Sequence, residues 1–184
     1  QDQELKVVSV CRLLKLKNID KAIMALEQAG IKYTYTIYGT GPEELALREL
    51  VLKQGARERV FLAGSIENER LKTILREYDL FIMVSFPETL GRVYFEAMAS
   101  GVPVVAARNT GIDKMIEDRV SGFLVNHTSV RQISGAIMYF SQLDQKEKES
   151  MQNKAQEVAR QHSWPVVLKK YRALYVQTTQ NASR

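Results

Sequence analysis

Short apolar runs alternate along the chain with longer amphipathic segments. The apolar runs are rich in β-branched residues and close at glycine or polar residues, which is typical of β-strands. Several of them are apolar throughout, as strands of a parallel sheet covered on both faces must be. We therefore predict six strands, at residues 5–10, 33–39, 59–64, 79–85, 102–107 and 122–126.

The amphipathic segments predict helices, several of which end at a glycine. Strands and helices that alternate through short links form right-handed βαβ units. The expected fold is therefore α/β: a doubly wound, six-stranded parallel sheet of Rossmann-like type with a helical tail. The predicted helices lie at 18–29, 42–54, 67–77 and 91–100 between the strands, and at about 129–141, 144–161 and 165–177 after the last strand.

Length and composition add limits to this picture. The 184 residues suit one core, and no linker or repeat divides them, so residues 1–184 are expected to form a single domain. The formal net charge of +5 is spread along the chain, which suits an anionic ligand but does not indicate nucleic acid. The lone Cys11 excludes an internal disulfide, and the separated His127 and His162 predict no metal site.

The ends and the hydropathy of the chain bear on its location. No apolar stretch reaches the roughly 18 residues that span a bilayer, and the first residues lack the layout of a signal peptide. A cytoplasmic location is therefore expected. The chain begins at Gln1 and enters a strand by about the fifth residue, so we also expect it to be a piece of a longer polypeptide.

Basic residues and glycines follow the first two predicted strands. Ligands of such sheets bind beyond the carboxyl ends of the strands. Arg12 follows the first strand and Lys17 precedes the next helix, whose N-terminus attracts anions, so phosphate is the expected guest. Solvated loop cations are the alternative. Gly39 and Gly41 after the second strand form either a tight turn or a backbone that a ligand can approach closely.

The loop after the fourth strand carries a carboxylate. Pro87 imposes an extended turn that presents Glu88 beyond the edge of the sheet. A helix is expected to begin at Thr89 or Leu90, so the backbone amides of Leu90, Gly91 and the next residue would lie in its first turn, where an anionic group can bind. A favourable interaction of Glu88 with the helix dipole is the structural alternative.

A second carboxylate, Glu96, lies eight residues later on the same helix. It shares a side with Arg92, so an exposed ion pair between the two is its structural alternative. Carboxylates accept hydrogen bonds from sugar hydroxyls, whereas Arg12, Lys17 and backbone amides suit a diphosphate. A ligand that combines both groups, such as a nucleotide sugar, would use Glu88 and Glu96 together with the cations.

These motifs carry a family resemblance. Glu88 and Glu96 within "SFPETLGRVYFEAMASGVPVV" form a Glu-x7-Glu motif, accompanied in order by "RLLKLK", "YGTGP", "FLAG", "GFLV" and "HSW". From about Val7 to Tyr175 the chain resembles the C-terminal, donor-binding domain of retaining glycosyltransferases of the GT-B fold, in particular glycosyltransferase family 4, the group 1 glycosyltransferases.

The resemblance implies a role for each candidate residue. It implies that Glu88 is the catalytic residue that binds hydroxyls of the donor sugar, with the remaining contacts divided among the parts of the nucleotide. These are Arg12, Lys17, Leu90 and Gly91 for the diphosphate, Glu96 for the ribose, and Ser65 and Ile66 for the base. It implies no metal and no cofactor, and a nucleoside-diphosphate sugar as donor, with a UDP-sugar favoured and a GDP-sugar as the alternative.

The resemblance also implies partners outside this chain. The acceptor site would lie on an N-terminal domain of the same polypeptide, so the isolated domain is expected to be inactive alone. The acceptor would be a saccharide or a lipid-linked molecule. Basic residues of the tail, such as Lys169, Lys170 and Arg172, either touch an anionic membrane at its cytoplasmic face or form a solvated helix face. No nucleic-acid partner is expected.

The chain departs from the family pattern at three glycines. Cys11 and Asn18 stand where the family has glycine, and Thr110-Gly111 stands where it has a glycine pair. Their absence would narrow the crevice for the diphosphate and the acceptor. The missing glycines and the basic charge leave open a non-catalytic nucleotide-sugar binding or interaction module. Because other proteins share the fold, a GT-B-like epimerase or phosphorylase also stays open. The Glu-x7-Glu spacing argues against an epimerase.

Overall fold

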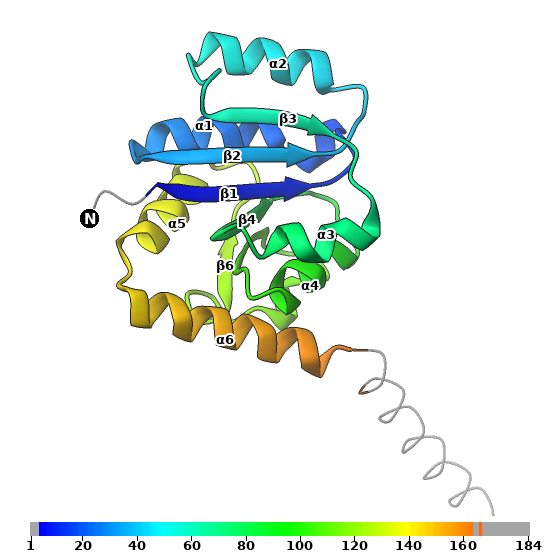
Figure 1. The fold of residues 1–184 in the computed structure, drawn as a ribbon, viewed down its shortest axis with the longest axis vertical. Helices are drawn as coiled ribbons and strands as arrows, with labels where there is room; N and C mark the ends of the chain where they lie inside the picture. Colours follow the sequence, from blue (N-terminus) through cyan, green and yellow to red (C-terminus); the bar gives the residue numbers. More distant parts are fainter. Residues whose placement is uncertain (1–3, 164–165, 167–184) are drawn as a thin grey trace, which may run out of the picture.

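The chain folds around a parallel six-stranded sheet, as a computed structural model describes for residues 4–163 and residue 166 (Figure 1). The strand order is β3-β2-β1-β4-β5-β6, and every neighbouring pair is parallel. The predicted doubly wound α/β fold is thereby confirmed. The strands are β1 (Leu5–Val10), β2 (Tyr33–Tyr38), β3 (Val60–Gly64), β4 (Leu80–Met83), β5 (Val104–Ala107) and β6 (Gly122–Val125).

Helices cover both faces of the sheet. Successive strand residues point to opposite faces, so Val7 and Val8 of β1 enter two separate apolar clusters. Buried residues of α1, α2 and α5, with Met151 of α6, complete one cluster, and those of α3, α4 and the rest of α6 complete the other. The α-helices are α1 (Ile19–Ala29), α2 (Glu44–Lys53), α3 (Asn68–Leu75), α4 (Arg92–Ala99), α5 (Val130–Gln142) and α6 (Gln145–Gln161), with short 3-10 helices η1 (Lys15–Lys17) and η2 (Asp113–Met115).

The burial of the strands follows their place in the sheet. Every residue of β4, β5 and β6 is buried, whereas β2 alternates between buried and half-buried residues. This agrees with the continuous apolar runs in the sequence. A buried polar contact also joins the centre of the sheet: the hydroxyl of Ser9 in β1 shares a 2.6 Å hydrogen bond with the hydroxyl of Tyr35 and donates one to the carbonyl of Ile82. Three adjacent strands are thereby tied together.

One helix starts later than its sequence pattern predicted. The helix expected to begin at Thr89 or Leu90 begins at Arg92, because Gly91 adopts a left-handed backbone with φ of 64° and caps the helix instead of continuing it. Leu90 and Gly91 therefore precede the first turn, which corrects the prediction. The helix predicted at 165–177 and the basic residues of the tail lie outside the described residues.

The topology decides which loops meet. The chain order reverses beside β1, which pairs with β2 on one side and with β4 on the other. In Figure 1 the arrowheads of β1, β2 and β3 point to the same side of the molecule. The loops that follow β1 and β4 therefore leave the sheet next to each other, at the switch point where open α/β sheets bind their ligands.

Candidate functional site

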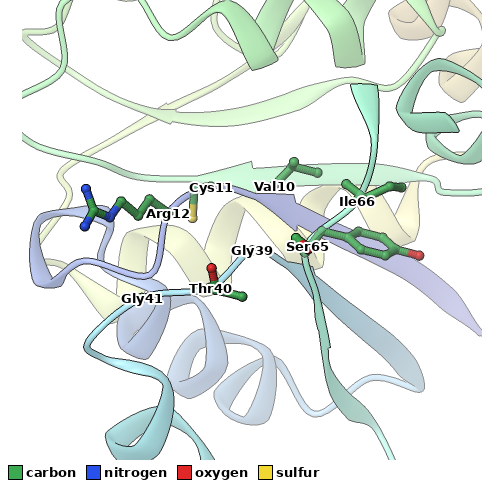
Figure 2. Close-up of a pocket in the computed structure, with 9 residues that line it drawn as sticks. Val10, Cys11, Arg12, Gly39, Thr40, Gly41, Ser65 and Ile66 are labelled. Carbon is green, nitrogen blue, oxygen red and sulfur yellow. The ribbon is translucent and has the colours of Figure 1, made fainter. Parts of the chain in front are cut away.

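A pocket of about 380 Å³ opens at the carboxyl ends of β1, β2 and β3 (Figure 2). It brings together three of the predicted site residues, Arg12, Ser65 and Ile66, although Arg12 lies far from the other two in the sequence. Figure 2 shows Arg12 and Ile66 at opposite ends of the lining, with Cys11 between them. The rest of the lining comes from Val10, Tyr38, Gly39, Thr40 and Gly41.

The glycines of this pocket allow two loops to pack against each other. A Cβ at Gly39, whose φ is 136°, would lie 2.9 Å from the carbonyl carbon of Cys11, and one at Gly41 would lie 2.8 Å from that of Leu13. The backbone amide of Leu13 donates a 2.9 Å hydrogen bond to the carbonyl of Thr40 across the same contact. Both glycines are therefore needed for the two loops to pack closely, independently of any contact that a ligand makes with their backbone.

Lys17 and Glu88 meet beside this pocket. The Nζ of Lys17 lies 2.6 Å from Oε2 of Glu88, and their side chains are only 17% and 14% exposed. The hydroxyl of Ser85, which is fully buried, donates a 2.9 Å hydrogen bond to the same oxygen. The structure therefore pairs the lysine predicted for the diphosphate with the glutamate predicted for the sugar.

The environment of Glu88 keeps its carboxyl group ionised. Burial by itself would raise the pKa of Glu88, but the contacts with Lys17 and Ser85 and a hydrogen bond from the backbone of Thr89 outweigh it, so the pKa is lowered below its usual value. Because these partners come from the β1–α1 and β4–α4 loops, the fold itself determines the charge of this group.

Asn18 holds these two loops in register. It has a left-handed backbone with φ of 51°, a conformation that asparagine tolerates better than most residues. Its side-chain amide donates a 2.8 Å hydrogen bond to the carbonyl of Val84, and the backbone amide of Phe86 donates to the carbonyl of Leu16 at 2.9 Å. Asparagine at this position thus keeps the left-handed backbone that a glycine would supply, and it adds a bond between the loops.

Cys11, the second departure from the family pattern, places its side chain in the pocket wall. Burial raises the pKa of the Cys11 thiol to about 11; Lys17 opposes this rise and Glu88 adds to it. The thiol is therefore protonated at neutral pH. Lys17 and Glu88 therefore lie close enough to the pocket wall to act on the charge of Cys11.

Gly111, in the loop after β5, makes a backbone contact that the sequence did not predict. A Cβ at this position would lie 2.6 Å from the carbonyl carbon of Thr89 and closer still to its oxygen. The amide of Gly111 donates a 3.2 Å hydrogen bond to the backbone carbonyl of Glu88. Gly111 stands where the family has one glycine of its pair. The loop that carries Glu88 packs directly against Gly111, next to Leu90.

Glu96 lies on α4, outside the residues that line the pocket. Its Oε1 is 3.8 Å from a guanidinium nitrogen of Arg92, and the two side chains are 30% and 91% exposed. The ion pair considered as a structural alternative is thus present at long range. The predicted roles of Glu96 at the ribose, of Leu90 and Gly91 at the diphosphate, and of Ser65 and Ile66 at the base stay predictions.

The described part of the chain has neither a cluster of metal ligands nor a membrane-spanning helix. Among residues 4–163 and 166, no three His, Cys, Asp or Glu side chains gather in a way that could hold a metal ion. No helix within the same residues is long and apolar enough to cross a bilayer.

The sequence matches a known protein family over most of its length. Residues 1–158 match the family described as glycosyl transferases group 1. The putative colanic acid biosynthesis glycosyltransferase WcaL of Escherichia coli (strain K12) is 32% identical over 162 residues, which make up 83% of this chain and 40% of WcaL. The amylovoran biosynthesis glycosyltransferase AmsK of Erwinia amylovora is 33% identical over 149 residues, 76% of this chain and 37% of AmsK.

Solved structures share the fold. HepE of Anabaena, in complex with UDP and glucose, superposes with a TM-score of 0.83 at 26% identity over 95% of this chain and 48% of that protein. The pneumococcal O-GlcNAc transferase GtfA, in complex with UDP and GlcNAc, gives 0.80 at 25% identity over 94% of this chain and 35% of its own. The chain spans about 40% of the length of the curated relatives WcaL and AmsK. By its sequence over residues 1–158 and by its fold, the chain belongs to the group 1 glycosyl transferases.

Proposed function

We propose that this chain is the nucleotide-sugar-binding half of a retaining glycosyltransferase, which moves a hexose-type sugar from a nucleoside diphosphate to a saccharide or lipid-linked acceptor. The observation that carries the proposal is the pocket containing Arg12, Ser65 and Ile66 beside the Lys17–Glu88 ion pair. It lies at the carboxyl edge of the sheet. Basic side chains, a carboxylate that can accept hydrogen bonds from sugar hydroxyls, and backbone groups lie close together there.

The donor follows from the chemistry of this edge. Among the described residues Arg12 has no ion-pair partner, so its guanidinium is available to a diphosphate. Glu88 would accept hydrogen bonds from the sugar, and Ser65 and Ile66 would lie against the base. UDP is favoured over GDP because the structural neighbours HepE and GtfA were solved with UDP.

Catalysis in this proposal is mainly electrostatic. As the bond between sugar and diphosphate breaks, negative charge grows on the leaving phosphate. Arg12, Lys17 and the amides of Leu90 and Gly91 would stabilise that charge, which requires neither a metal nor an acid. The acceptor would approach from an N-terminal domain of the same polypeptide, at the cytoplasmic side of the cell or its membrane.

Calorimetric titration of the chain with UDP, GDP and ADP tests donor binding. We expect UDP to bind, and a folded chain that binds none of the three at millimolar concentration would contradict the proposal. Arg12→Gln should weaken UDP binding by about tenfold or more, the effect of one charge-assisted hydrogen bond. Arg57→Gln is the matched control, because Arg57 lines a separate groove between α2 and β3; it should leave the affinity unchanged.

The ribose assignment has its own test. Glu96→Gln should lower the affinity for UDP by about 1.5–3 kcal/mol if its carboxylate accepts hydrogen bonds from the ribose hydroxyls. Arg92→Gln serves as the control, since it removes the long-range partner of Glu96 without removing the carboxylate. Equal affinities of Glu96→Gln and wild type would remove Glu96 from the site.

A further inference from the structure

The ion pair between Lys17 and Glu88 bears on the relative affinity of the site for its two ligands, the nucleotide sugar and the free nucleoside diphosphate. We propose that Glu88 makes the site bind the intact nucleotide sugar more tightly than the nucleoside diphosphate that remains after transfer. Glu88 would do so by pairing with Lys17 and by repelling the additional negative charge of the diphosphate product. This inference rests on the proposed function. It assigns to Glu88 a role in product release in addition to its contact with the sugar.

The position of the carboxylate supports this role. Oε2 of Glu88 accepts hydrogen bonds from Lys17 at 2.6 Å and from Ser85 at 2.9 Å. Ser85 is fully buried, and Lys17 and Glu88 are less than one fifth exposed. The carboxylate is therefore fixed beside the lysine, and a phosphate that approaches Lys17 also approaches Glu88.

The charge of the group supports it as well. The pKa of Glu88 is lowered by Lys17, Ser85 and the backbone of Thr89 despite its burial, so the carboxylate stays negative at neutral pH. In this half-buried place its repulsion of another anion is screened less than on an open surface.

The two ligands differ at the atoms that Glu88 would face. In a nucleotide sugar the terminal phosphate is esterified, and the sugar presents hydroxyl donors that a carboxylate can accept. In the free diphosphate the same phosphate has an additional ionisation near pH 6 and offers no donor at neutral pH. Glu88 thus favours the first ligand and disfavours the second. After transfer, the departure of the sugar leaves the two anions facing each other, which promotes release.

Isothermal titration with UDP and UDP-glucose at one fixed ionic strength tests the inference, with Glu88→Gln as the isosteric variant. The affinity of the variant for UDP should increase by about fivefold, the order of one ion pair. Its affinity for UDP-glucose should not increase. Unchanged or weaker UDP binding, or equal gains for both ligands, would overturn the inference. Circular dichroism and thermal unfolding establish that the variant is folded.

A double-mutant cycle separates the ion pair from simple charge removal. In a Lys17→Gln background, Glu88→Gln should raise UDP affinity by less than in wild type, because there is no lysine to release. An equal gain in both backgrounds would refute the role of the pair. If wild type binds neither ligand, the proposed function fails and this inference with it. Binding with an unaltered preference in Glu88→Gln overturns this inference alone.

Discussion

Replacing Gly111 by alanine probes the contact on which the Glu88 loop rests. The added Cβ would lie 2.6 Å from the carbonyl carbon of Thr89, a separation that real Cβ atoms essentially never show. Both opposing groups are backbone, so no side chain can rotate away to make room. The loop after β5 or the Glu88 loop must shift, and the amide of Gly111 then loses its 3.2 Å hydrogen bond to Glu88.

The size of the effect follows from this geometry. Overpacking of this kind costs about 1–3 kcal/mol, and a lost backbone hydrogen bond adds about 1 kcal/mol. For a chain of this length each kcal/mol shifts Tm by roughly 2–4 °C, so Gly111→Ala should unfold about 4–16 °C below wild type. Because the shift also displaces Glu88 from Lys17, nucleotide affinity should fall together with Tm.

Gly135→Ala is the matched control. Gly135 lies within α5, and a Cβ there would meet nothing within 4 Å. The same substitution should therefore stabilise the chain by about 0.5–1 kcal/mol, the helix-propensity difference between the two residues. Differential scanning fluorimetry measures both variants. A Gly111→Ala chain as stable as wild type, with unaltered UDP affinity, would refute the packing argument.

Two further predictions concern titratable groups of the site. The lowered pKa of Glu88 means that its ion pair contributes stability above the ordinary glutamate pKa near 4.5, and that this contribution is lost as pH falls through the lower folded-state pKa. Thermal unfolding of Glu88→Gln should therefore depend less on pH below about 4.5 than that of wild type; parallel curves would contradict this. Cys11 is the only cysteine of the chain, and a thiol pKa of about 11 against an ordinary 9 should make it about a hundredfold slower to react with iodoacetamide at pH 8 than in the urea-unfolded chain. Equal rates would show that the thiol is not buried as described.

Local pattern was sufficient to predict the fold. The six strands lie where their apolar runs predicted them, because burial on both faces leaves a continuous signal in the sequence. Boundaries at the site were less accurate. The start of α4 was placed two or three residues early because a glycine before a helical pattern can either continue the helix or cap it, and Gly91 caps it.

The site was predicted as a set of residues but not as a set of contacts. Lys17 and Glu88 were each expected to bind part of a ligand, whereas in the structure they bind each other across 71 positions of sequence. Gly111 was considered a remnant of a lost pair, although its contact with Thr89 makes it structurally necessary. Neither contact could be read from spacing, since each joins loops that follow different strands.

The sequence by itself therefore determined the alternation of elements and the parallel sheet, which depend on short-range periodicity and residue type. It also supplied the candidate residues, some from residue type and position and others, such as Ser65 and Ile66, only through the family resemblance. The tertiary structure decided which of those residues meet. Pairing of β1 with both β2 and β4 places Arg12 in a pocket with Ser65 and Ile66 and brings Lys17 to Glu88. Strand order is a property of the whole sheet, and the charge on each side chain follows from the neighbours that this order supplies.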